Sequence, residues 1–154
     1  MNTLQIEQIL FNNPNTKKIF KGVFAADKLP VKINTHPSIV IANTDSSDKP
    51  GTHWVAFYFK NAETAEFFDS YGQYPSNNYF INILKRNSKK FTFNRQQVQG
   101  YFSNTCGHYC ILFSLFKSKN KTTKYFLNTF KKNDYMYNDK IILRLFNKFK
   151  KCKK

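Results

Sequence analysis

Residues 99–110 read QGYFSNTCGHYC, and an almost unbroken apolar run then continues to Phe116. The segment from Cys106 to Phe116 is apolar on all sides rather than along one stripe, which is typical of a helix buried inside a domain. The polar residues at 103–105 stand directly before it, and side chains of these types cap helix N-termini. The stretch therefore predicts a central helix over 106–116 whose first residue is a cysteine.

Shorter patterns on both sides of this helix predict a small sheet and further helices. Strands are expected over 37–42, 53–59, 65–69 and 90–98, the second and third joined as a hairpin. Helices are expected over 4–11, 79–85, 125–130 and 140–149, and a loop over 20–30. The expected class is α+β, in which the helix that carries Cys106 packs on a small, mainly antiparallel sheet.

The 154 residues are enough for one domain with a core and too few for two. Aromatic residues make up 18% of the chain, which excludes a largely disordered protein. No apolar run approaches membrane-spanning length, the N-terminus lacks a signal-peptide pattern, and three cysteines suggest no disulfide framework. We therefore expect a single intracellular domain over 1–154 that is not secreted, ending in a basic, flexible tail at 150–154.

The formal charge of +16 is unevenly distributed. Between Ser70 and Asn133 there are eleven Lys and Arg and no Asp or Glu, and thirteen bases follow from Lys117 onward. Such a field attracts polyanions, so DNA is an expected partner of this basic surface. The plainer alternative is a solvated basic surface that only keeps the protein soluble.

Cys106 has the sequence context of a nucleophile. A thiol at a helix N-terminus lies near the positive end of the helix dipole, which lowers its pKa. Backbone N–H groups at that end have no helical partner and can face an oxyanion, and Gln99 is placed to supply a second donor from its side-chain amide. A single cysteine on an apolar helix is more often a core residue, so this interpretation depends on its partners.

Two upstream residues complete a candidate site. His53 begins a strand after a turn-rich loop, so its imidazole can stand at the edge of a cleft as a general base. Asp69 ends the neighbouring strand and could hold that imidazole in one tautomer. Each residue alone is weak evidence, but the order His53, Asp69, Gln99, Cys106 favours acyl transfer through a thiol.

The other His and Cys residues nearby are not expected at the reacting centre. His108 lies two residues after Cys106 and points to the other side of a helix, and Cys110 is expected to pack in the core. These three side chains do not converge, so no metal site is expected. Cys152 is expected to be a free thiol, and Trp54 either covers the imidazole or anchors the sheet.

These motifs resemble the adenovirus-type maturation proteases, cysteine peptidases that also occur in virophages and Maverick/Polinton-like elements. The resemblance covers about 20–116 and is carried by His53-Trp54, Asp69-Ser70-Tyr71-Gly72, and Gln99 followed by Cys106-Gly107. It implies a papain-like, adenain-like fold with His53 as base, Asp69 as its orienting acid, Gln99 as oxyanion donor and Cys106 as nucleophile. These enzymes are distant relatives of the proteases that process ubiquitin-like proteins.

The resemblance also implies a substrate and a place of action. Its members cleave structural precursor proteins at Gly-containing sites during virion maturation, so a monomer acting in the virion, virus factory or host nucleus is expected. The chemistry requires no cofactor; in adenovirus members viral DNA and a disulfide-linked peptide act as activators. No cysteine precedes Cys106, and Ser88 stands about where the linking thiol would be.

Three alternatives remain open from the sequence. A deubiquitinase or SUMO-type isopeptidase would use the same site on a cellular substrate. An acetyltransferase would pass the acyl group from the thioester to an amine instead of water. The alternative from another class is a basic nucleic-acid-binding virion protein in which the His53, Asp69 and Cys106 cluster is vestigial.

Overall fold

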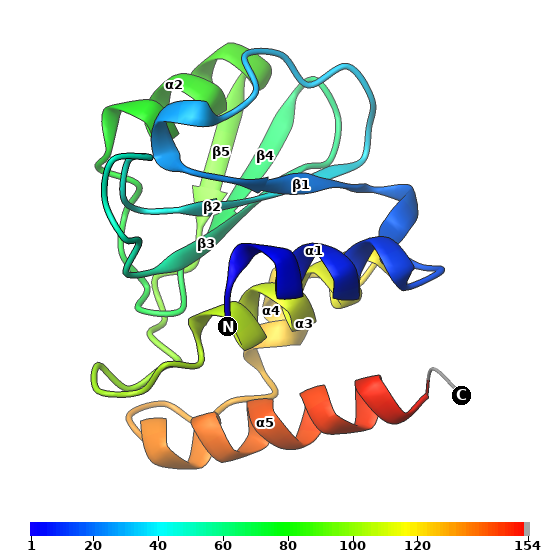
Figure 1. Cartoon of the computed structure of the whole chain (residues 1–154), viewed down its shortest axis with the longest axis vertical. Coiled ribbons are helices and arrows are strands. Elements are labelled where there is room, and N and C mark those ends of the chain that lie inside the picture. Colours follow the sequence, from blue (N-terminus) through cyan, green and yellow to red (C-terminus); the bar gives the residue numbers. More distant parts are fainter. Residues whose placement is uncertain (153–154) are drawn as a thin grey trace.

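The computed structural model describes residues 1–152 and has an α+β architecture, as expected (Figure 1). The helices are α1 (Thr3–Asn12), α2 (Asn78–Asn87), α3 (Cys106–Ser118), α4 (Thr123–Leu127) and α5 (Tyr135–Lys151). The strands are β1 (Phe20–Phe24), β2 (Ser38–Asn43), β3 (Trp54–Phe59), β4 (Thr64–Phe68) and β5 (Lys90–Phe93). Two short 3-10 turns, η1 (Thr16–Lys18) and η2 (Ala26–Lys28), lie on either side of β1.

The five strands form one sheet in the order β1-β2-β3-β4-β5. Its centre is antiparallel, because β3 pairs with both β2 and β4 in opposite directions. The edge strands β1 and β5 are each added in parallel to their neighbours. The predicted antiparallel hairpin is therefore the middle of the sheet, and it positions the residues at the start of β3 next to those at the end of β4.

Strand β1 is where the sequence prediction of a loop over 20–30 is wrong. The register of its pairing with β2 shifts between Phe20 and Val23, and Gly22 between them has a φ of 136°. A bulge of this kind interrupts the alternation of apolar and polar side chains by which a strand is recognised. The backbone of β1 nevertheless pairs along β2 and closes that edge of the sheet.

Both faces of the sheet are covered, which explains why all six residues of β2 are buried. Val40 and Phe57 point to the face on which α2 packs, through residues such as Leu84. Ile39 and Ile41 point to the other face, whose core also includes residues of α1, α3, α4 and α5. In Figure 1, α5 lies outermost on this second side, with α3 and α4 between it and the sheet.

Helix α3 is the central helix that the sequence predicts. Its contacts include β3, α1, α4 and α5. Tyr109, Cys110 and Phe113 are fully buried, and the Phe113 ring stacks on that of Phe68 at a centroid distance of 4.7 Å. Packing on several sides requires apolar residues all round the helix, and this is the pattern that the sequence shows.

Several elements end at different places than the sequence predicts; helix α4, for example, ends at Leu127 instead of Phe130. Strand β5 stops at Phe93 instead of Val98, because the buried Asn94 turns its side chain to the backbone of Asp69. Helix α5 begins earlier and continues through Lys150 and Lys151, residues expected in the tail; residues 153–154 lie outside the described part. No helix among the described residues is long and apolar enough to cross a membrane.

Candidate active site

Three of the side chains expected at one site come from three separate elements and meet in space. His53 directly precedes β3, Asp69 directly follows β4, and Cys106 is the first residue of α3. Because β3 and β4 are antiparallel neighbours, the start of one lies beside the end of the other. The backbone N–H of Trp54, at the start of β3, reaches the Cys106 sulfur, so the helix N-terminus lies against the same corner of the sheet.

The His53 ring is held by Asp69. Its Nε2 lies 2.7 Å from Oδ1 of Asp69, and both side chains are buried. The same carboxylate oxygen accepts the backbone N–H of Tyr71 at 2.9 Å, which fixes its position. With Nε2 engaged, Nδ1 is the ring nitrogen left for the thiol of Cys106. Within residues 1–152, Nδ1 is buried without a hydrogen bond of standard geometry.

The surroundings shift the pKa values of His53 and Cys106 toward an ion pair. Burial disfavours the imidazolium, but hydrogen bonding with Asp69 and the nearby Cys106 sulfur outweigh it and raise the pKa of His53 to about 9. Burial also disfavours the thiolate, yet the His53 ring and the backbone N–H groups of Trp54 and Gly107 lower the pKa of Cys106. Between these two pKa values the pair exists as thiolate and imidazolium.

An aromatic wall, made of Tyr71 and Tyr101, lines the His53 side of the site. The Tyr71 ring stacks on the His53 ring at 4.4 Å and 17°, and Tyr101 lies against Tyr71 at 5.2 Å. The wall restrains the imidazole and covers one of its faces. Trp54 begins β3 and packs against the core, as the second of its two expected places has it. Its Nε1 donates to the Met1 carbonyl at 3.4 Å, and its ring lies close to Gly107.

Gln99 is fully buried, on the loop that leads to Cys106. Its Nε2 donates to the Ser103 carbonyl at 3.1 Å, and its Oε1 accepts the hydroxyl of Ser70. The amide nitrogen carries two hydrogens, of which Ser103 takes one. The side chain is therefore fixed at both ends and keeps one N–H for a further acceptor.

The start of α3 is capped differently from the sequence prediction. Thr105 occupies the N-cap position, but its side chain makes no capping hydrogen bond. Its hydroxyl instead donates to Oδ1 of Asp139, at 3.0 Å. The first backbone N–H groups of α3 therefore donate to no side chain of Thr105. The backbone N–H of Gly107 is free to contact the Cys106 sulfur.

Asp139 on α5 is a residue at this site that the sequence does not reveal. Besides Thr105, it accepts the hydroxyl of Tyr109 at 3.0 Å and the backbone N–H of Gly100 at 3.4 Å. No local spacing links a residue 30 to 39 positions away to this loop. The one available signal is that Asp139 is one of only two acids after Lys117.

The remaining cysteine and histidine side chains lie where the sequence suggests. His108 packs edge-on against Phe146, at a centroid distance of 4.6 Å. Cys110 is fully buried, which raises the pKa of its thiol well above the ordinary value. Cys152 is exposed, and none of the three cysteines forms a disulfide.

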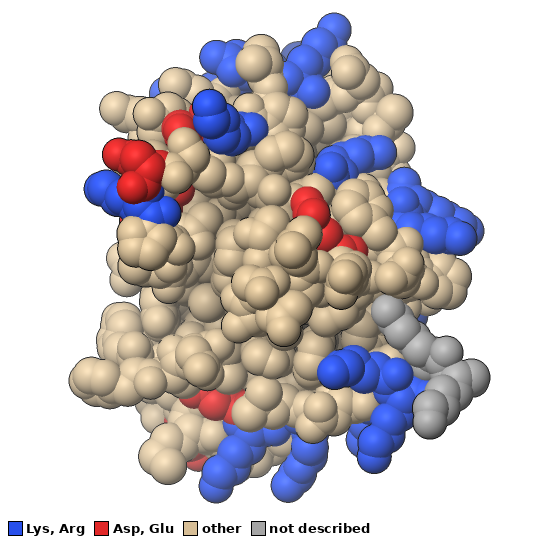
Figure 2. All heavy atoms as spheres, in the orientation of Figure 1, with Lys and Arg blue, Asp and Glu red and all other residues tan. Residues whose placement is uncertain are grey.

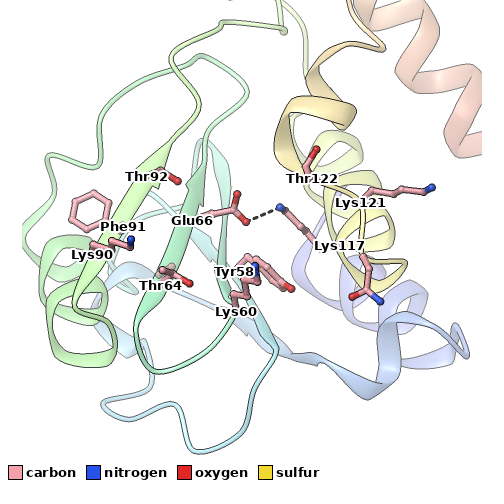
Figure 3. A pocket seen from close by; sticks show the side chains of 12 residues that line it. Tyr58, Lys60, Thr64, Glu66, Lys90, Phe91, Thr92, Lys117, Lys121 and Thr122 are labelled. Atoms are coloured by element: carbon pink, nitrogen blue, oxygen red, sulfur yellow. Dashed lines mark ion pairs between the residues drawn. The ribbon is translucent and has the colours of Figure 1, made fainter.

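A separate cavity of about 450 Å³ opens near the other end of α3, between that helix and strands β3 to β5 (Figure 3). Its lining includes four lysines: Lys60, Lys90, Lys117 and Lys121. The Lys117 ammonium is buried, pairs with the Glu66 carboxylate at 2.6 Å and lies 4.9 Å from the centre of the Tyr58 ring. Burial lowers the pKa of Lys117, although Glu66 acts in the opposite direction.

The excess positive charge is spread widely over the surface. On the face drawn in Figure 2, Lys and Arg side chains lie mainly around the outline and along the edge near the C-terminal helix, and acidic side chains are few. The count of 25 bases against 9 acids agrees with this picture. On this face, the basic side chains therefore form no single stripe.

Comparison with known proteins identifies the family. A family model described as adenovirus endoprotease matches residues 20–141. Among solved structures, the chain is similar to the ASFV pS273R protease, with 22% identity and a TM-score of 0.48. The similar part covers 68% of this chain and 43% of that one, so this chain spans less than half of the solved protein. A search of the curated proteins gives no match. Since the family model covers most of the chain, including His53, Asp69 and Cys106, the chain belongs to the adenovirus endoprotease family of cysteine proteases.

Proposed function

We propose that the chain is an endopeptidase in which Cys106 attacks a peptide carbonyl, His53 transfers the protons and Asp69 orients His53. The observation that carries this proposal is that Asp69 binds one nitrogen of the His53 ring, while the other ring nitrogen is buried beside the Cys106 thiol, without a hydrogen bond of standard geometry within residues 1–152. The opposite pKa shifts of His53 and Cys106 support it, because a raised pKa of the imidazole and a lowered pKa of the thiol favour a thiolate–imidazolium pair.

The first step forms a thioester. The Cys106 thiolate adds to the carbonyl carbon and a C–S bond forms, leaving the negative charge on the carbonyl oxygen. The free amide N–H of Gln99 and the backbone N–H groups at the start of α3 are the donors for that oxyanion. The His53 imidazolium gives its proton to the departing amine as the C–N bond breaks.

The second step releases the acid. Neutral His53 takes a proton from a water molecule, and the resulting hydroxide adds to the thioester carbonyl. The C–S bond breaks, and Cys106 leaves as the thiolate beside His53, which still holds the proton taken from water. The product forms as a carboxylic acid, which gives its own proton to the solvent. Atoms and charge balance without a metal or an organic cofactor.

For the substrate, we propose structural precursor polypeptides of a virus or virus-like element, cleaved at Gly-containing sites in the virion or the virus factory. Family membership supports this choice. A panel of peptides with Gly at each position around the scissile bond, and matched peptides with Ala instead, would test it. Equal rates on both sets would contradict the Gly requirement. Cleavage of ubiquitin-like conjugates alone, or acyl transfer to added amines, would favour an isopeptidase or an acetyltransferase.

The direct test of the proposed chemistry is loss of hydrolysis in Cys106→Ala and His53→Ala. Removing a nucleophile or its base typically lowers kcat by about 10⁴-fold or more, and we expect that size of effect in both variants. Cys152→Ala is the matched control, because it removes an exposed thiol and should keep full activity. Unchanged turnover in Cys106→Ala would refute the proposal.

As a second candidate function, we propose that the basic surface binds DNA. The specific support is the cavity lined by four lysines, three of which have no acidic partner among residues 1–152. Binding through phosphates releases counterions, so the apparent affinity should fall steeply as salt rises. A measured affinity for duplex DNA that does not change with salt would contradict this candidate. Cys106→Ala should bind DNA as tightly as the wild-type protein does.

A further inference from the structure

We infer that Asp139 is a positioning residue for the oxyanion site, holding the loop between Gln99 and Cys106 in its working shape. The inference rests on the proposed function, since the oxyanion site matters only if Cys106 attacks a carbonyl. Asp139 lies on α5, far along the chain from His53 and Asp69. It is the only acidic residue of the described part that hydrogen-bonds to this loop.

One carboxylate contacts both ends of the loop. Oδ2 accepts the backbone N–H of Gly100 at 3.4 Å, next to Gln99. Oδ1 accepts the Thr105 hydroxyl at 3.0 Å, next to Cys106. The two donors proposed for the oxyanion, the Gln99 amide and the N–H groups at the start of α3, are thus fixed relative to each other through Asp139.

A third contact extends this hold into α3. The Tyr109 hydroxyl, one turn into the helix, has a single hydrogen, which is shared between Oδ1 of Asp139 at 3.0 Å and the Val98 carbonyl at 3.1 Å. Burial, together with the neighbouring Asp139 carboxylate, raises the pKa of Tyr109, so this hydroxyl stays protonated and able to donate. The residues before the loop and the first turn after it therefore share one anchor.

The anchor itself is well supported on α5. The neighbouring Asn138 is fully buried, accepts the backbone N–H of Lys131 and donates to its carbonyl, both at 2.8 Å. Asp134 caps the start of the helix by accepting the N–H of Tyr137 at 3.2 Å. The segment of α5 that carries Asp139 is therefore held on both sides of Asn138 by contacts that do not involve the loop.

Loss of this anchor should lower kcat because the oxyanion donors are displaced, and not because the thiol loses its reactivity. A displacement of about 1 Å at a reacting group can cost roughly 10²-fold in rate, and loss of one oxyanion donor costs roughly 10²- to 10³-fold. Asp139 touches neither His53 nor the Cys106 sulfur. The thiolate–imidazolium pair should therefore survive when Asp139 is replaced.

The experiment compares Asp139→Ala and Asp139→Asn with Asp134→Asn, a matched control on the same helix. Asparagine keeps an oxygen for Thr105 and Tyr109 but presents its amide nitrogen toward Gly100. We expect kcat to fall about 100-fold in Asp139→Ala and about tenfold in Asp139→Asn, with KM changed less than threefold. Asp134→Asn loses the same charge, keeps a good capping side chain and should retain wild-type kcat.

Two further readouts separate positioning from simple damage to the fold. Alkylation of Cys106 by iodoacetamide needs the thiolate but no oxyanion site, so its rate should remain within about threefold of wild type in both Asp139 variants. Amide hydrogen exchange at Gly100 should accelerate in these variants, while exchange in β3 stays unchanged.

The outcomes distinguish the two proposals. If wild-type protein hydrolyses no peptide, the proposed function fails, whatever happens at Asp139. If Asp139→Ala leaves Gly100 exchange unchanged, or loosens the loop without lowering kcat, the positioning role is refuted. A parallel loss of kcat, alkylation rate and β3 protection would also refute it, because the effect would then be general unfolding.

Discussion

Each end of helix α3 holds a pair of opposite charges, one pair buried and the other partly buried, and the two pairs differ in which polar atoms lack a partner. At the C-terminal end, the Lys117 ammonium meets the Glu66 carboxylate at 2.6 Å, and the second carboxylate oxygen accepts the Thr123 hydroxyl at 2.9 Å. At the N-terminal end, Asp69 engages only one nitrogen of His53.

The difference shows how a structural ion pair can be told from one available for chemistry. In the Lys117–Glu66 pair the charges satisfy each other, and aromatic rings lie beside the ammonium. In the His53–Asp69 pair the buried Nδ1 has no standard hydrogen bond within residues 1–152, and the nearest acidic group is a thiol with a lowered pKa. The His53 ring therefore keeps a nitrogen that can exchange a proton with the thiol, whereas the Lys117 and Glu66 charges already neutralise each other.

The largest effect is expected when the N-terminal pair is broken. Asp69→Ala frees the imidazole from its orienting partner and should lower kcat by about 10³-fold, the scale of general acid–base catalysis. Asp69→Asn can still accept from Nε2 and should lose much less, about tenfold. Because Asp69 raises the pKa of His53, the alkaline fall in activity of Asp69→Asn should move below pH 9. Steady-state kinetics as a function of pH measure both the fall in kcat and the alkaline midpoint. If Asp69→Ala were as active as wild type, the His53–Asp69 pair would have no catalytic role.

Breaking the C-terminal pair should change stability but not catalysis. Removing one partner of a buried pair costs roughly 3–5 kcal/mol. Glu66 is 26% exposed, so for Lys117→Met we expect a smaller loss, about 2 kcal/mol in the free energy of unfolding. Lys89→Met is the control, because the Lys89–Glu63 pair is exposed and should contribute little. Urea denaturation tests this, and a large loss of kcat in folded Lys117→Met would remove the distinction between the two ends.

The smallest effect is expected at the aromatic wall beside His53. Tyr71→Leu removes the ring that stacks on the imidazole at 4.4 Å but leaves the Tyr71 backbone N–H bound to Asp69. We expect kcat to fall about threefold to tenfold, since a stacked ring pair contributes about 1 kcal/mol. Tyr71→Phe keeps the ring and should stay close to wild type. A loss in Tyr71→Phe as large as in Tyr71→Leu would mean that the hydroxyl, not the ring, matters.

The sequence predicts the central parts of this molecule better than its edges. The all-round apolar run at 106–116, the strand that follows His53 and the strand that precedes Asp69 all agree with periodicity, so the meeting of these residues could be anticipated. Strand β1 could not, because its bulge at Gly22 conceals the pattern. Asp139 could not either, since its contacts with Gly100 and Thr105 exist only after α5 has packed on α3. The catalytic roles of His53, Asp69, Gln99 and Cys106 stay predictions.

The central claim is that Cys106 exists as a thiolate beside protonated His53, and the rate of its alkylation as a function of pH tests this most directly. Site-resolved mass spectrometry with iodoacetamide would follow Cys106 and Cys152 in the same sample. We expect Cys106 to react faster than Cys152 at neutral pH. Its alkylation rate should rise with a midpoint below that of an ordinary thiol and change again as His53 titrates at about pH 9. In His53→Ala the midpoint should move upward, because burial raises the pKa of the thiol and the imidazole that lowers it is then gone. A midpoint for Cys106 at or above that of Cys152, unaffected by His53→Ala, would contradict the account.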